Sequence, residues 1–337
     1  MAEDGSESEA RAGVRVDAEP SQGAAKGSRL RGFVGLLLQL ACVAYVARVL
    51  WRERAELSTA FDLSAGAIIS LLALMAVAHV QRAYEFTYML RRLGVKEPFG
   101  EGFLLTGAGF LLNHLPFNAG LVMRATVLKR DHALPYTSYL ALVMVNALMN
   151  VAMAAVVGLV TVAFTAHGRG TLPLLAAFAA MLVGAVTLAF LPVSWVPEGS
   201  HFLWRRLRML GSGIALLRGN TSNLLLLAAL AFTKVVVSAV RVSICFGALH
   251  AYLSPLPAAL LSSTTIVFSL VNVTPGNLGL REVAMAAVST VIGSSYQVGM
   301  AAASIDRAML LAYTVVSGLP GLYALRRRGP FKASGAG

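Results

Sequence analysis

The stretch NVTPGNLGLRE, residues 272–282, interrupts an apolar part of the chain. It separates two apolar runs, residues 256–271 and 283–292. Each run is shorter than the roughly 20 helical residues that cross a bilayer. Pro275 and Gly276 favour a break in the helix, and Arg281 and Glu282 follow at the start of the second run. Because charges on a broken helix at membrane depth must be buried in protein or line a cavity, the stretch predicts a functional site.

A similar stretch, NHLPFNAGL at residues 113–121, lies 159 positions earlier when its first Asn is compared with Asn272. The two stretches share Asn, Pro, Asn, Gly and Leu without a gap, and Arg124 follows the first of them. The match aligns Pro116 with Pro275, Asn118 with Asn277, and Gly120 with Gly279. Short, interrupted apolar segments that recur in two halves of a chain are typical of a transporter's binding site.

The composition predicts an all-α, polytopic membrane protein. The 337 residues are 57% hydrophobic and only 13% charged, whereas soluble domains carry about 25% charged residues. The net charge of +12 is explained by Lys and Arg beside membrane segments, and no basic domain indicates a nucleic-acid partner. Cys42 and Cys245 lie inside apolar runs, which favours packing over a redox or metal-binding role.

Six apolar stretches are long enough to span a bilayer: residues 33–51, 63–90, 136–165, 172–191, 223–248 and 298–325. The two interrupted stretches are interpreted as re-entrant hairpins. Polar residues 1–28 predict a disordered cytoplasmic tail, residues 29–328 a transmembrane domain, and residues 329–337 a short C-terminal tail.

The distribution of Lys and Arg predicts the orientation. If both termini are cytoplasmic, four basic clusters also lie on the cytoplasmic side: Arg91/Arg92, Lys129/Arg130, the Arg205–Arg218 loop and the cluster at Arg326. The loops at His167 and His250, which are poor in Lys and Arg, then lie outside, and the loop at Arg52 is the exception. Three spans separate the hairpins, so the repeat has inverted topology. We therefore expect a cell-membrane protein with both termini in the cytoplasm.

Arg124 and Arg281 are the leading substrate-binding candidates. In one interpretation each arginine points into a polar cavity beside the N-terminus of a half-helix. Free N–H groups and the helix dipole favour an anion there, and a guanidinium can bind a phosphate through two hydrogen bonds. In the other interpretation they reach the membrane interface or form structural ion pairs, Arg281 with Glu282 or with Asp306.

Other polar residues of the motifs are open to two interpretations. Glu282 is either a proton- or cation-coupling carboxylate or the counter-charge of Arg281, and we favour the counter-charge. Asn118 and Asn277 suit a left-handed backbone next to a helix start, which favours a capping role over contact with a head group. Both asparagines nevertheless remain substrate-binding candidates, together with Gly120 and Gly279, while Pro116, Pro275 and Gly276 serve as structural breaks.

Two further helical faces carry charge inside predicted spans. Lys234, Ser238, Arg241 and Cys245 recur on one helical face, which we expect to point into the bundle, although Arg241 could also reach the interface. On an earlier span, Arg82 and Glu85 are three residues apart, a spacing that favours an ion pair.

No enzyme, cofactor or metal site is predicted. Six histidines are scattered without metal-ligand spacing: His79, His114, His132, His167, His201 and His250. The chain has no GxSxG, Walker-type or GxGxxG motif in a suitable context.

PGNLGLRE at residues 275–282 resembles the P-G-G-x-G-x-R-E signature of the flippase-like transmembrane domain of the lysylphosphatidylglycerol synthase family. The stretch from 113 to 124 is similar to the family's first motif, N-x-x-P-x-R-x-G-x-x-x-R. Arg307 matches an arginine often found in the last span, and Arg307 and Lys234 complete the set of substrate-binding candidates. The sequence departs from the family where Asn118 replaces Arg, where Asn277 replaces Gly, and where NALMN at 146–150 replaces E-R-x-x-D and so lacks three charges.

The resemblance covers about residues 33–325 and implies lipid translocation. Family members that synthesise lipids carry a soluble aminoacyl-transferase domain, which we do not find here. We therefore expect a flippase for an anionic phospholipid or a polyisoprenoid-linked lipid, whose partners are membrane lipids. Coupling to an ion or proton and association with a lipid-synthesising enzyme stay open. The alternatives are a small-anion secondary transporter and a non-transporting subunit of a lipid-modifying system.

Overall fold

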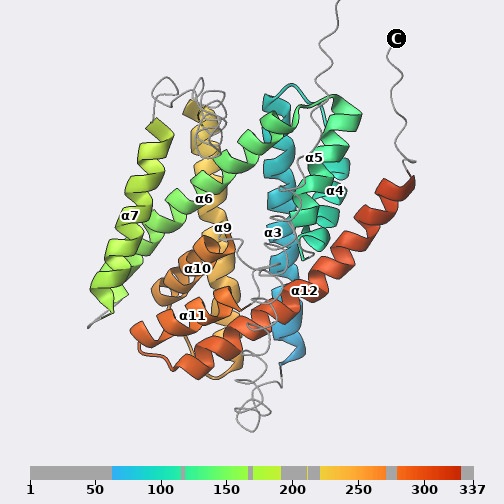
Figure 1. The fold of residues 1–337 in the computed structure, drawn as a ribbon. Helices are drawn as coiled ribbons and strands as arrows, with labels where there is room; N and C mark the ends of the chain where they lie inside the picture. Colours follow the sequence, from blue (N-terminus) through green and yellow to red (C-terminus); the bar gives the residue numbers. More distant parts are fainter. Residues whose placement is uncertain are drawn as a thin grey trace, which may run out of the picture.

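The computed structural model describes residues 63–114, 118–165, 170–190, 211, 221–270 and 279–327 (Figure 1). All regular structure in these ranges is helical, which confirms the predicted all-α class. Five helices are long and apolar enough to cross a membrane: α3 (Ala65–Arg92), α6 (Tyr136–Thr165), α7 (Thr171–Phe190), α9 (Thr221–Ala248) and α12 (Tyr296–Arg327). They coincide with five of the six predicted spans. The sixth predicted span and both predicted tails lie outside the described residues.

Four shorter helices correspond to the interrupted stretches. They are α4 (Phe99–Leu112), α5 (Ala119–His132), α10 (Pro255–Leu270) and α11 (Leu280–Val291). Helix α10 begins at Pro255, because a proline at the first helical position loses no hydrogen bond and already has a helical φ. As the sequence predicted, none of these four helices reaches the roughly 20 residues that a full crossing requires.

Helix α5 begins at a residue with left-handed backbone. Asn118, its N-cap, has φ 52°, a conformation that asparagine adopts more readily than most residues. Gly120 follows where α5 crosses α4, and a Cβ atom on it would lie 1.9 Å from the carbonyl oxygen of Gly109. Only glycine fits this approach. The crossing brings the start of α5, and with it Arg124, against α4.

Helix α11 begins in a related way at Gly279, whose φ of 85° is accessible mainly to glycine. The carboxylate of Glu282 turns back to accept a hydrogen bond of 2.8 Å from the backbone N–H of Gly279. This contact satisfies a donor that would otherwise be unpaired at the helix start. The expected helix breakers Pro116, Pro275 and Gly276, and Asn277, lie outside the described residues.

The two halves of the chain are arranged alike. Helices α3, α4, α5 and α6 are followed by α9, α10, α11 and α12, whose starts lie 156, 156, 161 and 160 residues later, respectively. Helix α4 packs against α3, α5 and α12, and α10 packs against α9, α11 and α6. Helix α6 of the first half therefore packs against α10 of the second half, and the tilted α12 of the second half packs against α4 of the first (Figure 1).

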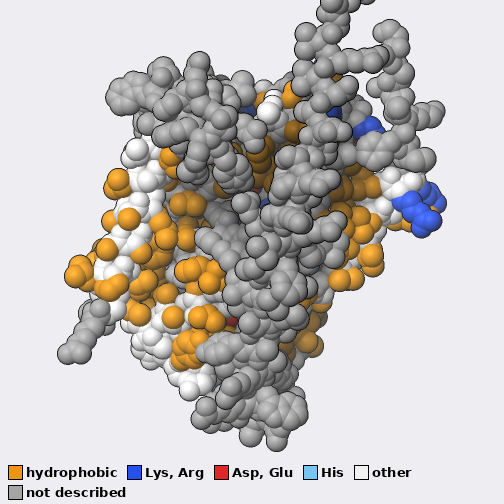
Figure 2. Space-filling view, in the orientation of Figure 1, with side chains coloured by type: hydrophobic (Ala, Val, Ile, Leu, Met, Phe, Trp, Pro, Cys, Tyr) orange, Lys and Arg blue, Asp and Glu red, His pale blue; other side chains and the backbone are white. Residues whose placement is uncertain are grey.

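The outer surface is largely apolar. Phe164 and Leu172 expose 71% and 75% of their area on the outside of α6 and α7. Figure 2 shows hydrophobic side chains over this side of the molecule, while Lys and Arg gather at the end of α12. Such a surface is stable in contact with lipid, and it leaves the bundle interior as the place for the charged residues of the motifs.

Candidate functional site

One cavity of about 390 Å³ lies between the two halves of the bundle. Its wall is formed by eight of the nine helices in the described ranges, all except α7. Five predicted site residues line it: Asn118, Arg124, Lys234, Arg281 and Arg307. The two motifs, 159 positions apart in the sequence, thus contribute to the same cavity.

Three predicted site residues have positions next to the cavity rather than in its wall. Gly120 provides the close crossing of α4 and α5, and Gly279 with Glu282 forms the start of α11. Glu282 is only 3% exposed and caps its own helix. The favoured interpretation of Glu282 as the counter-charge of Arg281 is therefore wrong: Glu282 caps α11, and Arg281 pairs with a different carboxylate.

That carboxylate is Asp306 of α12, which is fully buried. It accepts hydrogen bonds from Arg241 of α9, with Nε–Oδ1 2.9 Å and Nη2–Oδ2 2.7 Å. It also accepts one from Nη2 of Arg281 on α11. The alternative in which Arg241 reaches the interface is wrong, because the side chain is 5% exposed and held by this pair. One carboxylate therefore joins three helices.

A second buried ion pair lies in the cavity wall and joins α3 to α9. Nζ of Lys234 contacts the carboxylate of Glu85, which is 2% exposed, and donates to Oδ1 of Asn150 at 3.2 Å. The expected pair of Arg82 with Glu85 is therefore wrong. The guanidinium of Arg82 instead lies 4.4 Å from the centroid of the Phe110 ring.

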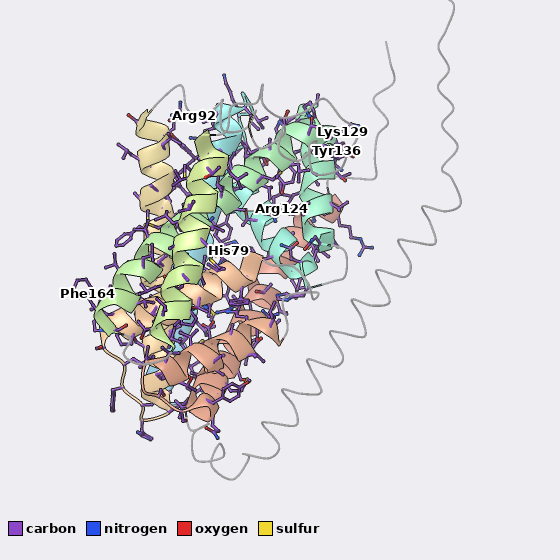
Figure 3. The ribbon with its side chains drawn as sticks, turned by 60° about the vertical axis from the view of Figure 1, so that its left-hand side comes forward. His79, Arg92, Arg124, Lys129, Tyr136 and Phe164 are labelled. Atoms are coloured by element: carbon purple, nitrogen blue, oxygen red, sulfur yellow. The ribbon has the colours of Figure 1, made fainter. Side chains whose placement is uncertain are left out.

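Arg124 differs from Arg281 in its surroundings. Its Nε donates to the carbonyl of Gly120 at 3.3 Å, and its guanidinium lies 5.9 Å from the centroid of the Phe86 ring. No carboxylate of the described ranges forms an ion pair with Arg124. Figure 3 places Arg124 within the body of the bundle, whereas Arg92 and Lys129 lie toward its upper end and Phe164 lies at its left-hand edge.

The cavity is electropositive. Six cations line it: Arg82, Arg124, Lys234, Arg241, Arg281 and Arg307. Glu85 is the one carboxylate in its wall, and Asp306 and Glu282 are buried directly behind it. Among the described residues, these six cations exceed the three carboxylates by three charges. Since charges in a partly buried cavity are weakly screened, this excess strongly favours an anionic ligand.

A comparison with protein families adds an independent finding. The model of the family described as "Lysylphosphatidylglycerol synthase TM region" matches residues 32–318, most of the chain. The chain belongs to this family. The resemblance noted from PGNLGLRE is thereby confirmed, and with five candidate spans the chain is a multi-pass membrane protein. No match was found among curated proteins or among solved structures.

Sequence reasoning missed several residues of the cavity. Asn146 and Asn150, which the sequence comparison treated only as lost charges, lie in its wall. Tyr139 and Thr106 also line it, and nothing in an apolar stretch distinguishes such residues from packing residues. Within the described ranges, no three His, Cys, Asp or Glu side chains converge to hold a metal ion.

Proposed function

We propose that the protein translocates a lipid with an anionic head group across the membrane. The observation that carries this proposal is the electropositive cavity that both motifs share inside a lipid-facing bundle. The head group would bind Arg124, Arg281 and the neighbouring helix starts, while the acyl chains stay in the bilayer. A phosphate crosses bare hydrocarbon at prohibitive cost, and a prearranged cationic cavity lowers that cost.

Family membership supports a lipid as the substrate. The family is described as the transmembrane region of lysylphosphatidylglycerol synthase, a name that gives a phospholipid as the product. In this chain we assign that region a transport role, with no chemical step and no resident cofactor. An anionic phospholipid or a polyisoprenoid-linked lipid meets the charge requirement, and both keep an apolar tail in the membrane.

We also propose that α4–α5 and α10–α11 are re-entrant hairpins related by an inverted repeat. The similar spacing of the helix starts, 156–161 residues, and the packing of α6 and α12 against short helices of the other half support this arrangement. In Figure 1 the two pairs of short helices lie toward opposite ends of the bundle. A repeat of this kind permits alternating access to a shared cavity, which a flippase requires.

The topology is testable by cysteine accessibility in intact cells. We expect both termini and the Arg205–Arg218 loop to be protected from an impermeant thiol reagent. The variants His167→Cys and His250→Cys should react readily with the reagent, because the loops at these positions would face outward. A Cys42→Ser/Cys245→Ser background removes the native thiols. Labelling of the two termini from opposite sides would contradict the inverted repeat.

The transport proposal is testable in proteoliposomes that contain acyl-labelled fluorescent lipids. We expect the protein to make labelled phosphatidylglycerol in the inner leaflet accessible to an external quencher, and phosphatidylcholine much less so. Protein-free liposomes provide the control. Uptake of radiolabelled glycerol phosphate without lipid movement would favour the small-anion transporter, and the absence of both activities would favour a non-transporting subunit.

A further inference from the structure

We propose that the cavity contains an uncharged hydrogen-bonding subsite for phosphate oxygens, formed by Tyr139 and Thr106 beside Arg124. This inference rests on the proposed function and assigns the first motif's side of the cavity to the head-group phosphate. Tyr139 belongs to α6 and Thr106 to α4, and both line the cavity with Arg124.

The hydroxyl of Tyr139 is the first observation. The side chain is 2% exposed, and its hydroxyl has no hydrogen-bond partner among the described residues. Its ring packs edge-on against Phe86, with centroids 6.5 Å apart, and the guanidinium of Arg124 lies 5.9 Å from the same Phe86 ring. Phe86 thus places Tyr139 and Arg124 near each other. A phenylalanine at position 139 would fill the same space without burying an unpaired hydroxyl.

Thr106 is the second, independent observation. It is 2% exposed, and within the described part of the chain its hydroxyl also has no partner. Other buried helical threonines donate to a backbone carbonyl in the preceding turn: Thr87 to Ala83 at 2.9 Å, Thr161 to Val157 at 2.8 Å, Thr264 to Leu260 at 3.0 Å and Thr314 to Leu310 at 2.7 Å. The hydroxyl of Thr106 is left available for a ligand in the cavity.

The chemistry of this side of the cavity matches a phosphate. Two hydroxyls and a guanidinium can donate to several oxygens of one anion, and none of these donors is paired with a carboxylate of the described residues. Arg281, in contrast, is already bound to Asp306. We therefore place the first anion contact at Arg124, Tyr139 and Thr106. The phosphate could belong to a lipid head group or to a soluble phosphate ester.

Binding measurements on the full chain in detergent test the subsite. The probes are short-chain phosphatidylglycerol, phosphatidylcholine of the same chain length, and glycerol 3-phosphate. We expect Tyr139→Phe and Thr106→Val each to weaken phosphatidylglycerol binding about tenfold, because each removes a hydrogen bond to a charged group. Both variants should unfold at or above the wild-type temperature, since neither loses a protein–protein hydrogen bond.

Tyr88→Phe is the matched control. The Tyr88 hydroxyl donates to Oδ1 of Asn223 at 2.6 Å and accepts from Nη2 of Arg92 at 2.9 Å, and it lies outside the cavity wall. This variant should lose thermal stability and bind phosphatidylglycerol like the wild type. The opposite responses of two Tyr→Phe changes separate a ligand contact from a structural contact.

Each outcome is decisive. If Tyr139→Phe and Thr106→Val bind phosphatidylglycerol like a wild type that also translocates it, the subsite is wrong and the flippase proposal stands. If the wild type binds none of the probes, both proposals fail. If glycerol 3-phosphate binds as tightly as phosphatidylglycerol and both variants weaken it, the subsite is supported and the ligand is a soluble phosphate ester.

Discussion

Asp306→Asn is expected to destabilise the protein by about 3–5 kcal/mol, a large part of the roughly 5–15 kcal/mol that stabilises a typical domain. Asp306 is fully buried and is the carboxylate that holds both Arg241 and Arg281. Asparagine keeps the size of the side chain but leaves two buried guanidinium groups without their counter-charge. Detergent-solubilised protein should therefore melt at a much lower temperature or elute as aggregate from a sizing column.

Two comparisons make the result specific. Asp131→Asn breaks a partly exposed pair with Arg130, so its effect should stay between about 0 and 1 kcal/mol. The combination of Asp306→Asn with Arg241→Gln and Arg281→Gln should recover much of the melting temperature, because no unpaired charge remains buried. An Asp306→Asn protein as stable as the wild type would show that the ion pairs contribute little to the fold.

The broad architecture was readable from the sequence because it depends on local features. Runs of apolar residues set the helix lengths, and Pro, Gly and Asn mark where a helix ends. The predicted bounds for α6, residues 136–165, coincide with the observed helix. The repeated NxxPxNxGL pattern also identified two stretches that contribute to one cavity.

The pairing of charges was not readable, because it depends on neighbouring helices. Adjacent residues on a helix point in different directions, so Glu282 could not neutralise Arg281, and the sequence could not choose Asp306 as the partner. Arg82 and Glu85 have a spacing that permits a pair, yet Glu85 contacts Lys234 on another helix. A buried lysine without a carboxylate would be costly, whereas Arg82 is accommodated by the ring of Phe110.

The same limit applies to uncharged groups of the cavity. Tyr139 and Thr106 occur in apolar stretches, where the sequence predicts core packing. Their distinguishing feature is that their hydroxyls lack hydrogen-bond partners among the described residues, which only a three-dimensional arrangement reveals. Hydroxyls of this kind are costly to bury, so an unpaired one in a cavity wall indicates a ligand contact more strongly than residue type does.

Arg124→Gln is expected to lower the initial rate of phosphatidylglycerol translocation at least tenfold while the melting temperature stays close to that of the wild type. Loss of one charged hydrogen bond is worth about 1.5–3 kcal/mol, and a guanidinium can supply two to a phosphate. Stability should be preserved because no described carboxylate depends on Arg124 for its pairing. Reconstituted vesicles give the rate, and thermal unfolding in detergent gives the stability.

The variants Arg124→Lys and Lys129→Gln provide the controls. Arg124→Lys keeps the charge but loses the planar guanidinium that can donate two parallel hydrogen bonds to a phosphate, so we expect an intermediate rate of translocation. Lys129→Gln removes a charge from the same helix outside the cavity wall, where Lys129 lies 4.6 Å from the ring of Tyr136, and it should translocate lipid normally. A wild-type rate for Arg124→Gln would exclude Arg124 as the phosphate ligand, and an equal loss for Lys129→Gln would attribute the effect to overall charge. A defect confined to position 124, graded from lysine to glutamine, would instead identify a guanidinium that binds the head group during transport.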